Sequence, residues 1–418
     1  MLPPDFKSGE PPKRGLVGSI PTHFRQVPSF LRCKFLQVVV VLLWYLIPSG
    51  GAGLPERVVM AGGGTGGHLF PAIAVARELE AMEPPTEVHF IGTSHGIEAR
   101  ILPREGFPLH VVKAEGFRGR GLRKGAALWK LVVGFRQSLK ILRELRPRWV
   151  LGVGGYASLP AGLAAVALRI PLFLHEQNAI PGLANRVLAR WAREVFLSYP
   201  NTRGLPKKAR TLVTGNPVRR ELFGSSGDPA FFGLSQGKRV VLVFGGSQGA
   251  RSINTALAGD LGLFQDYKER VAFIHQVGEG MVEEMKGVYK EMGLEAHVTP
   301  FIYDMGKAYA TACLVVCRAG ATTLAEVTAL GKPSILVPFP YAVGDHQLHN
   351  ARALERAGAA LVITESEFEP GLLGGKILEL LFDDERLEAM GMEARKLGRP
   401  RAAGTIAERC WEVVSARG

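Results

Sequence analysis

The sequence has few cysteines and no apolar run long enough to cross a membrane as a helix. The four cysteines, Cys33, Cys313, Cys317 and Cys410, form no CxxC pair. This argues against a metal cluster or a disulfide scaffold and predicts buried free thiols in a reducing compartment. The apolar run at 35–47 has 13 residues, whereas a membrane-spanning helix needs roughly 20.

Recognisable nucleic-acid-binding patterns are also absent, although the chain is strongly basic. The formal charge is +13 and the sequence pI is about 9.7, so the surface attracts polyanions such as nucleic acid, acidic lipid or pyrophosphate. There is no zinc-finger spacing and no aromatic RNP-like strand. We therefore expect no nucleic-acid partner, and an anionic membrane and a diphosphate compound account for the charge.

Apolar residues make up 47% of the 418 residues and charged residues 21%, which predicts a globular protein of two domains. An apolar segment at 57–61 is followed by a glycine-rich turn at 62–67 and a helical pattern at 71–82. The same order returns at 239–244, 245–250 and 252–257. This repetition predicts an α/β protein with two Rossmann-like, doubly wound domains.

The first glycine-rich turn contains G-x-G-x-x-G, which by itself is a weak signal for a dinucleotide. An NAD site also needs an acidic residue at the end of the second strand. The expected strand at 88–91 is followed by Gly-Thr-Ser-His at 92–95, without an acid. The sequence therefore argues against an NAD-linked oxidoreductase, which we keep as an alternative.

The stretch at 317–350 carries the most chemistry. Apolar segments at 314–316 and 334–337 predict two strands, and helices are expected at 321–330 and from 344–347 onward. Two strand ends and two helix N-termini at one edge make an anion site. Glu326 could accept hydrogen bonds from ribose hydroxyls, and Gln347 could bind a sugar. The alternative is an ordinary βαβ unit in which the glycines only close turns.

This stretch, together with HEQNA at 175–179 and GNPVR at 215–219, resembles the MurG family of GT-B glycosyltransferases. The resemblance begins near Arg57 and continues to the C-terminus. It implies a GT-B fold, with two Rossmann-like domains facing each other across a cleft. The implied parts are an extension at 1–56, an acceptor and membrane-associating domain at 57–217, a UDP-sugar donor domain at 218–400, and a helix at 401–418 that packs back on the first domain.

The family resemblance also implies the reaction. N-acetylglucosamine would move from UDP-N-acetylglucosamine to the C4 hydroxyl of the muramyl sugar of lipid I, with inversion, giving lipid II for peptidoglycan synthesis. The expected partners are these two substrates and the anionic surface of the inner membrane, with the enzyme peripheral on its cytoplasmic side. No cofactor is expected.

Inversion requires one base near the acceptor, and His68 is the candidate, because a helix N-terminus keeps an imidazole neutral. Glu176 is the second catalytic candidate. The alternatives are that His68 only caps the helix and that Glu176 is a structural carboxylate. For Ile302, which is expected to contact the donor, the alternative is a simple strand-to-helix turn in which Asp304 caps the next helix. The residues expected to bind UDP-N-acetylglucosamine are Thr65, Gly66, Gly67, Asn178, Arg219, Ser247, Ile302, Ala321, Thr322, Thr323, Leu324, Ala325, Glu326 and Gln347.

Metal-dependent glycosyltransferases often hold the diphosphate with a D-x-D pair and a divalent ion. No such pair occurs in a glycine-rich loop here, and the acidic pair at 383–384 is predicted to begin a helix. We therefore predict no metal site, with Ser247, Arg219 and the backbone amides at 321–324 stabilising the departing diphosphate.

A long helix is expected at 122–146, with apolar residues flanked by many basic ones. This composition suits a surface on anionic lipid, which is what the family resemblance implies for this region. The alternative is a crossover helix that faces the sheet. At the other end, Arg32 and Lys34 precede the 35–47 run, as in a signal peptide. Because the donor is cytosolic, we expect residues 1–56 to be a mis-assigned start or a weak membrane anchor.

Two other functions remain as alternatives. A related GT-B enzyme could use diacylglycerol as its acceptor, although HEQNA and GNPVR favour the MurG family. A non-catalytic sugar-nucleotide-binding subunit is the other, although both halves of the site are present in one chain.

Overall fold

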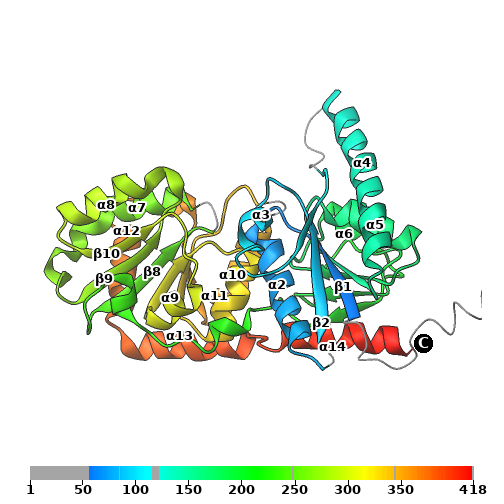
Figure 1. The fold of residues 1–418 in the computed structure, drawn as a ribbon. Coiled ribbons are helices and arrows are strands. Elements are labelled where there is room, and N and C mark those ends of the chain that lie inside the picture. Colours follow the sequence, from blue (N-terminus) through cyan, green and yellow to red (C-terminus); the bar gives the residue numbers. More distant parts are fainter. Residues whose placement is uncertain (1–55, 84, 115–121, 247–248, 343–344, 417–418) are drawn as a thin grey trace, which may run out of the picture. The chain divides into compact units, whose positions relative to one another are not determined.

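The computed structural model describes residues 56–416 except 84, 115–121, 247–248 and 343–344, and only the backbone at 122–128. Residues Pro55–Gly418 form one compact unit. It contains two parallel sheets, each covered by helices on both faces (Figure 1). The N-terminal extension predicted at 1–56 lies outside the described residues, apart from the first residue of β1.

The first sheet has seven strands in the order β3-β2-β1-β4-β5-β6-β7. All its strand pairs are parallel. Its strands are β1 (Glu56–Gly62), β2 (Thr86–Gly92), β3 (Leu109–Val111), β4 (Val150–Gly154), β5 (Leu172–Glu176), β6 (Glu194–Leu197) and β7 (Thr211–Val213). The chain leaves β1 in one direction along the sheet and returns beside it at β4. Ligands bind at such a switch point, beyond the carboxyl ends of the strands.

The second sheet has six parallel strands in the order β10-β9-β8-β11-β12-β13. Its strands are β8 (Arg239–Phe244), β9 (Val271–Gln276), β10 (Glu295–Thr299), β11 (Leu314–Cys317), β12 (Ser334–Leu336) and β13 (Ala360–Val362). Its switch point lies between β8 and β11. The repeated strand–glycine–helix pattern of the sequence therefore corresponds to two equivalent switch points, one in each sheet.

The helices of the first half are α2 (Gly66–Glu80), α3 (Glu98–Ile101), α4 (Leu122–Leu145), α5 (Ser158–Ala167) and α6 (Leu183–Leu188). Those of the second half are α7 (Arg251–Asp260), α8 (Val282–Glu291), α9 (Met305–Thr311), α10 (Ala321–Leu330), α11 (His346–Arg356), α12 (Leu372–Leu381), α13 (Asp384–Leu397) and α14 (Ala402–Ser415). Short 3₁₀ turns lie between them: η3 (Arg220–Leu222), η4 (Pro229–Phe232), η5 (Leu261–Tyr267), η6 (Glu279–Met281) and η8 (Glu365–Glu367).

Because side chains alternate between the two faces of each strand, each sheet has an apolar core on both of its faces. In β1, Val58 and Met60 belong to the core that includes α2, and Val59 and Ala61 to the core that includes α5. Successive strand side chains point to opposite faces, so a strand buried on both faces must be apolar throughout. This is why 57–61 and 239–244 could be recognised as strands.

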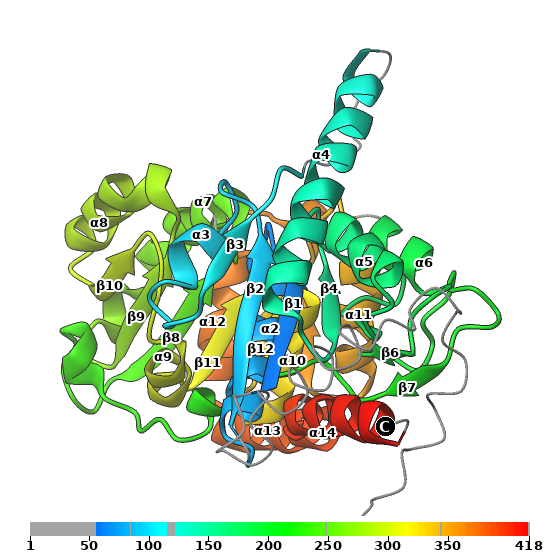
Figure 2. The same ribbon diagram turned by 45° about the vertical axis from the view of Figure 1, so that its right-hand side comes forward.

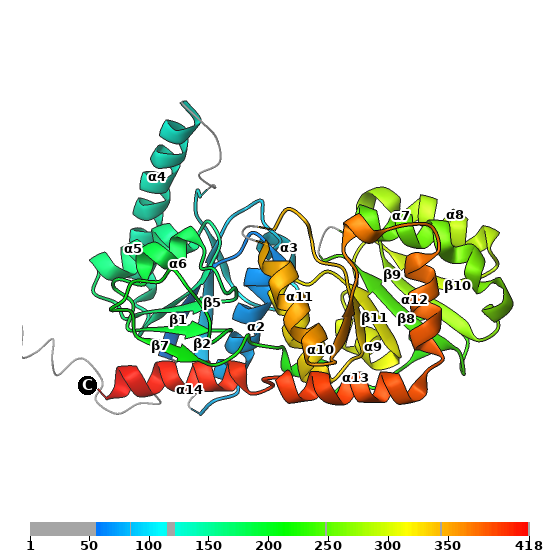
Figure 3. The same cartoon turned by 180° about the vertical axis from the view of Figure 1, so that it is seen from behind.

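Helix α14 belongs to the core of the first sheet although it ends the chain. Ile406 and Cys410 are fully buried in the same cluster as Trp149, and Trp411 packs edge-on against Trp149. Arg409 forms an ion pair with Glu194 at 2.8 Å. Figure 3 shows α14 following α13 and running past α2. The domain boundaries themselves stay a prediction.

Helix α4 confirms the predicted long helix. Its C-terminal half packs on α5 with Phe135, Leu139 and Leu142 in the apolar core, whereas its N-terminal half extends beyond α5 (Figure 2). In that half, Trp129 and Val132 are exposed at 67% and 40%. The C-terminal half thus packs as a crossover helix does, and a role of the N-terminal half on anionic lipid stays a prediction. Within the described residues, no helix is long and apolar enough to cross a membrane.

Several sequence predictions need correction. Helix α2 begins at Gly66, not at Pro71, which lies inside it. After residue 368 the chain forms three separate helices, α12, α13 and α14. The helix start predicted at 383–384 is confirmed, because Asp383 caps α13 by accepting a hydrogen bond from the Arg386 N–H at 2.9 Å. The segment at 223–236 between the two sheets is more than a linker, because its Phe232 and Leu234 are buried in a core of the second sheet. The short strands β3, β6 and β13 were not predicted.

Candidate functional site

The glycine-rich turn after β1 lies directly against the turn after β4. Gly62, Gly63 and Gly64 all have positive φ angles. A Cβ atom on Gly155 would lie 2.1 Å from the Gly63 carbonyl oxygen, and one on Gly62 would lie 2.3 Å from the Gly154 carbonyl oxygen. Only glycine permits this backbone approach. The switch point of the first sheet is therefore built from two glycine turns in contact.

Helix α2 starts within this turn, and Pro71 removes one of the backbone hydrogen bonds of its first turn. Because Pro71 has no N–H, it cannot donate to the carbonyl of Gly67 four residues earlier. The hydroxyl of Thr322, on the first turn of α10, donates to this carbonyl at 3.0 Å instead. Thr322 also accepts a hydrogen bond from Asn216 at 3.3 Å. The first sheet's helix and the second sheet's helix are thus joined at their N-termini.

His68 lies in the first turn of α2, and its Nδ1 atom is 3.0 Å from the Thr65 hydroxyl. Its Nε2 edge faces the β4 turn, where a Cβ on Gly154 would lie 3.0 Å from Nε2. Burial lowers the pKa of His68 below its ordinary value of 6.5, and the charge of Glu98 opposes this in part. The imidazole is therefore neutral at pH 7, as a general base must be.

Glu176 lies at the carboxyl end of β5 and is 1% exposed. One carboxylate oxygen accepts from the N–H of Asn178 at 3.0 Å and the other accepts from the N–H of Gly182 at 3.1 Å and the amide of Asn185 at 2.9 Å. Burial raises its pKa, and these hydrogen bonds partly offset the rise. Through these hydrogen bonds, Glu176 joins Asn178, Gly182 and Asn185 of the 176–185 loop, and its catalytic role stays a prediction.

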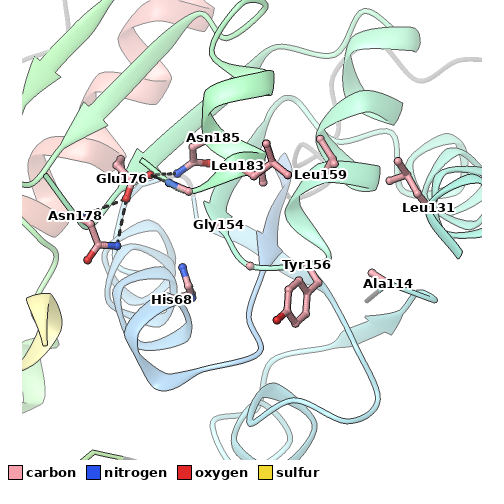
Figure 4. A pocket seen from close by; sticks show the side chains of 13 residues that line it. His68, Ala114, Leu131, Gly154, Tyr156, Leu159, Glu176, Asn178, Leu183 and Asn185 are labelled. Carbon is pink, nitrogen blue, oxygen red and sulfur yellow. Dashed lines mark hydrogen bonds between the residues drawn. The ribbon is translucent and has the colours of Figure 1, made fainter. Parts of the chain in front are cut away.

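These residues line a cavity of about 320 Å³ beside α4. Figure 4 shows His68 at the start of α2, with Glu176, Asn178 and Asn185 on one side and Tyr156 on another. Its apolar lining comes from Leu131, Leu159 and Leu183. The cavity therefore combines a neutral imidazole and several amides with an apolar wall that leads to α4.

At the second sheet, Arg219 and Glu326 lie together. The guanidinium of Arg219 is 3.8 Å from a carboxylate oxygen of Glu326 and stacks over the Phe70 ring at 4.3 Å. The other carboxylate oxygen of Glu326 accepts from the Tyr309 hydroxyl at 2.9 Å. Burial raises the pKa of Glu326, and Arg219 opposes this. The Nε atom of Arg219 is buried without a partner among the described residues, so it can still donate to a ligand.

The other predicted donor residues occupy the same strand edge. Helix α10 begins at Ala321 as predicted, so Ala321, Thr322, Thr323, Leu324 and Ala325 form its first turns. Gln347, in the first turn of α11, accepts from the N–H of Phe339 at 3.0 Å. Ile302 is 6% exposed, and Asp304 precedes α9 without a side-chain cap. Ser247 lies outside the described residues.

Two buried polar side chains that bind these loops were not among the predicted site residues. Glu98 accepts from the N–H of Gly64 at 2.7 Å, so an acid does follow the second strand, further along than a dinucleotide site would place it. Gln276 donates to the carbonyls of Gly246 at 2.6 Å and Pro300 at 3.3 Å. Neither has a local sequence signal, because each acts on a loop distant in the chain. Within the described ranges, no group of three or more His, Cys, Asp and Glu side chains could hold a metal ion.

Two parallel sheets, each with a switch point at its strand ends, make up a GT-B fold. Comparison with known proteins agrees. The family models for the N-terminal and C-terminal domains of glycosyltransferase family 28 match residues 58–197 and 240–406. A crystal structure of MurG from Acinetobacter baumannii superposes with a TM-score of 0.65 at 32% identity, covering 86% of this chain and all of the other.

Curated relatives narrow the class further. A protein of Geobacter sulfurreducens is 47% identical over 361 residues, which is 84% of this chain and 97% of the relative. One from Myxococcus xanthus is 45% identical over 359 residues, covering 86% and 93%. Both are named UDP-N-acetylglucosamine–N-acetylmuramyl-(pentapeptide) pyrophosphoryl-undecaprenol N-acetylglucosamine transferase. The chain belongs to the MurG family of glycosyltransferase family 28.

Proposed function

We propose that this protein transfers N-acetylglucosamine from UDP-N-acetylglucosamine to the C4 hydroxyl of the muramyl sugar of lipid I, with inversion, and so forms lipid II. Membership of the MurG family supports this reaction. The observation that carries the mechanism is the hydrogen bond from Thr322 to Gly67. It brings the helix that bears His68 to the helix expected to hold the donor diphosphate.

The donor lies, in this proposal, over the N-terminus of α10. The amides at 321–324 and the positive end of the helix dipole face the diphosphate. Arg219 leaves its loose 3.8 Å contact with Glu326 and binds the phosphate oxygens, for which a guanidinium is suited. The released oxygen of Glu326 accepts from the ribose hydroxyls. Ile302 meets the uracil ring through its backbone, and Ser247 binds phosphate.

The sugar of the donor lies between the two strand edges. Gln347 and Asn178 contact its hydroxyls, while the backbone at Thr65, Gly66 and Gly67 forms its floor. Asn178 is well suited, because Glu176 fixes its backbone and its side-chain amide at once. Glu176 thereby acts through Asn178 rather than on the reacting atoms.

The acceptor enters the cavity beside α4, and His68 takes the proton of its C4 hydroxyl through Nε2. The acceptor oxygen forms a bond to the anomeric carbon as the bond from that carbon to the diphosphate breaks on the opposite face. The leaving UDP keeps the bonding electron pair. Its new charge develops toward Arg219 and the α10 amides, which are already oriented and need no reorganisation.

The apolar wall of the cavity suits a lipid-linked acceptor, since Leu131 of α4 lines it and Trp129 and Val132 of the same helix are exposed. The sequence of the N-terminal half of α4 also contains the basic residues Arg123, Lys124 and Lys130. We propose that this half of α4 rests on the anionic cytoplasmic surface of the inner membrane, so that the lipid stays in the bilayer while its sugar reaches His68.

Transfer of radiolabelled N-acetylglucosamine to lipid I and to diacylglycerol tests the function. Labelling of lipid I alone is expected, and labelling of diacylglycerol alone would overturn the proposal. His68→Gln should lower kcat by about 10²- to 10⁴-fold without weakening UDP binding. The exposed His95 in the neighbouring loop provides the control His95→Gln.

The pH profile gives a second readout. The base must be unprotonated, so kcat/KM should fall as the pH drops through the lowered pKa of His68, below pH 6.5. This acid limb should be missing in His68→Gln. Full turnover in that variant would show that another group is the base.

A further inference from the structure

Glu98 is a completely buried carboxylate that the proposed mechanism does not use. It lies at the start of α3, and its oxygens accept three hydrogen bonds. The donors are the N–H of Gly64 at 2.7 Å, the N–H of Thr93 at 2.9 Å and the Thr93 hydroxyl at 2.7 Å. Three donors satisfy the carboxylate, which is the condition under which burying it is tolerated.

The chain also leaves space for this side chain. A Cβ atom on Gly63 would lie 2.6 Å from Glu98, one on Gly92 would lie 2.8 Å from it, and one on Gly96 would lie 2.1 Å from it. Gly63 in addition has a φ angle of 127°, which side-chain-bearing residues rarely adopt. Three glycines from two loops therefore surround the Glu98 side chain.

The loop that Glu98 binds leads directly to His68. Thr65 follows Gly64; its carbonyl accepts from the His68 N–H at 3.2 Å, and its hydroxyl is 3.0 Å from Nδ1 of the same residue. We infer that Glu98 is a positioning residue for the transfer reaction, which holds the 62–65 loop and through it the His68 ring. This inference rests on the proposed function, in which His68 is the base.

The charge of Glu98 acts on the same ring. Burial lowers the pKa of His68, and Glu98 is the group that raises it again. Glu98 from α3 and His175 from β5 act on His68, and Tyr156 and Glu176 line the same cavity. On α10, which packs against α2, Glu326 is paired with Arg219. Burial holds the pKa of His175 at about 3, so this ring is neutral and Glu98 dominates the field at His68.

Glu98→Gln tests the inference with little change in shape. The new amide can keep its oxygen toward Thr93, but its NH₂ group then opposes the Gly64 N–H, donor against donor. We expect kcat to fall about tenfold, because small displacements of a reacting group are costly, with UDP affinity unchanged. The pKa of the His68 ring, followed by NMR in the full chain, should fall by roughly 0.5 to 1 unit, and the acid limb should move with it.

Two further variants separate positioning from general stability. Thr93→Val removes one donor but keeps the charge and the Gly64 contact, so kcat and the His68 pKa should stay close to wild type. Glu98→Asp keeps the charge on a shorter side chain, so it should lower kcat while leaving the His68 pKa nearly unchanged. Glu98→Asp also tests the inference if Glu98→Gln does not fold.

An unchanged His68 pKa and an unchanged kcat in Glu98→Gln would overturn the inference, as would wild-type kcat in Glu98→Asp. An equal loss of kcat in Thr93→Val would do the same, since the effect would then follow from loop packing. If His68→Gln keeps full turnover, the base assignment fails by itself, while the NMR titration still reports whether Glu98 acts on the His68 ring.

Discussion

The hydrogen bond from Thr322 to the Gly67 carbonyl should contribute to the free energy of unfolding, and this contribution should depend on Pro71. Thr322→Val keeps the side-chain shape but removes the hydroxyl that donates at 3.0 Å and accepts from Asn216 at 3.3 Å. The Gly67 carbonyl cannot turn to its own helix, because Pro71 has no N–H to offer. Gly67 is exposed and Thr322 is 9% exposed, so water can replace part of the loss. We expect the free energy of unfolding to fall by about 1 kcal/mol, the low end for a broken hydrogen bond.

Replacing Pro71 by alanine changes this outcome. The backbone of the Pro71→Ala variant gains an N–H at this position that can donate to the Gly67 carbonyl, so Thr322→Val should cost less in that background. We expect a coupling energy of about 0.5 to 1 kcal/mol, measured by urea denaturation of the four proteins of the cycle with fluorescence and circular dichroism together.

Thr328 on the same helix supplies the control. It is 6% exposed and donates to the Leu324 carbonyl at 2.7 Å within α10, so Thr328→Val should show no coupling to Pro71→Ala. Equal coupling energies for the two threonines, or none for Thr322, would refute the reasoning. In the transfer assay, Thr322→Val should also reduce kcat/KM, because the two helices lose a fixed contact at the site.

Two other outcomes are expected. Gln276→Leu removes the hydrogen bonds to Gly246 and Pro300, which join the loops expected to hold phosphate and uracil. The KM for UDP-N-acetylglucosamine should therefore rise about tenfold, which corresponds to roughly 1.4 kcal/mol of lost binding. The control variant Gln265→Leu, at an exposed residue, should leave this KM unchanged. A calorimetric titration with UDP that finds equal affinity in Gln276→Leu and wild type would contradict this. Trp129→Ala, at a side chain that is 67% exposed, should weaken binding to anionic vesicles by about two- to tenfold and leave transfer to a detergent-solubilised acceptor unchanged. The matched variant Trp191→Ala, also exposed, should behave as wild type in the vesicle assay, and equal losses in both would argue against α4 as the membrane surface.

Local patterns were sufficient for the long elements and insufficient for their junctions. Helix α10 runs from Ala321 to Leu330, as its pattern predicts, since Gly320 precedes it and Gly331 ends it in the left-handed region. The helical spacing of apolar residues at 71–82 predicts that helix α2 begins at Pro71. It begins at Gly66 instead, and the carbonyl that Pro71 leaves free is bound by a residue more than 200 positions away.

The candidate site residues also divide into those that local sequence indicates and those that depend on contacts between distant segments. His68, Arg219 and Glu326 could be chosen from the sequence, since their chemistry and their place after strands point to a site. The sequence could not show that Arg219 and Glu326 contact each other, or that Glu176 has its oxygens filled by backbone and amide donors. It was silent on Glu98, whose partners Gly64 and Thr93 belong to two different loops.

The sequence by itself determined the two glycine-rich strand–helix openings, the fold class and the family, because strand burial and turn geometry depend on neighbouring residues. Only the tertiary structure decided which strand ends lie side by side. The order of strands places β4 beside β1 and β11 beside β8, and hydrogen bonds and charges act over a few ångströms in space, whatever the distance along the chain.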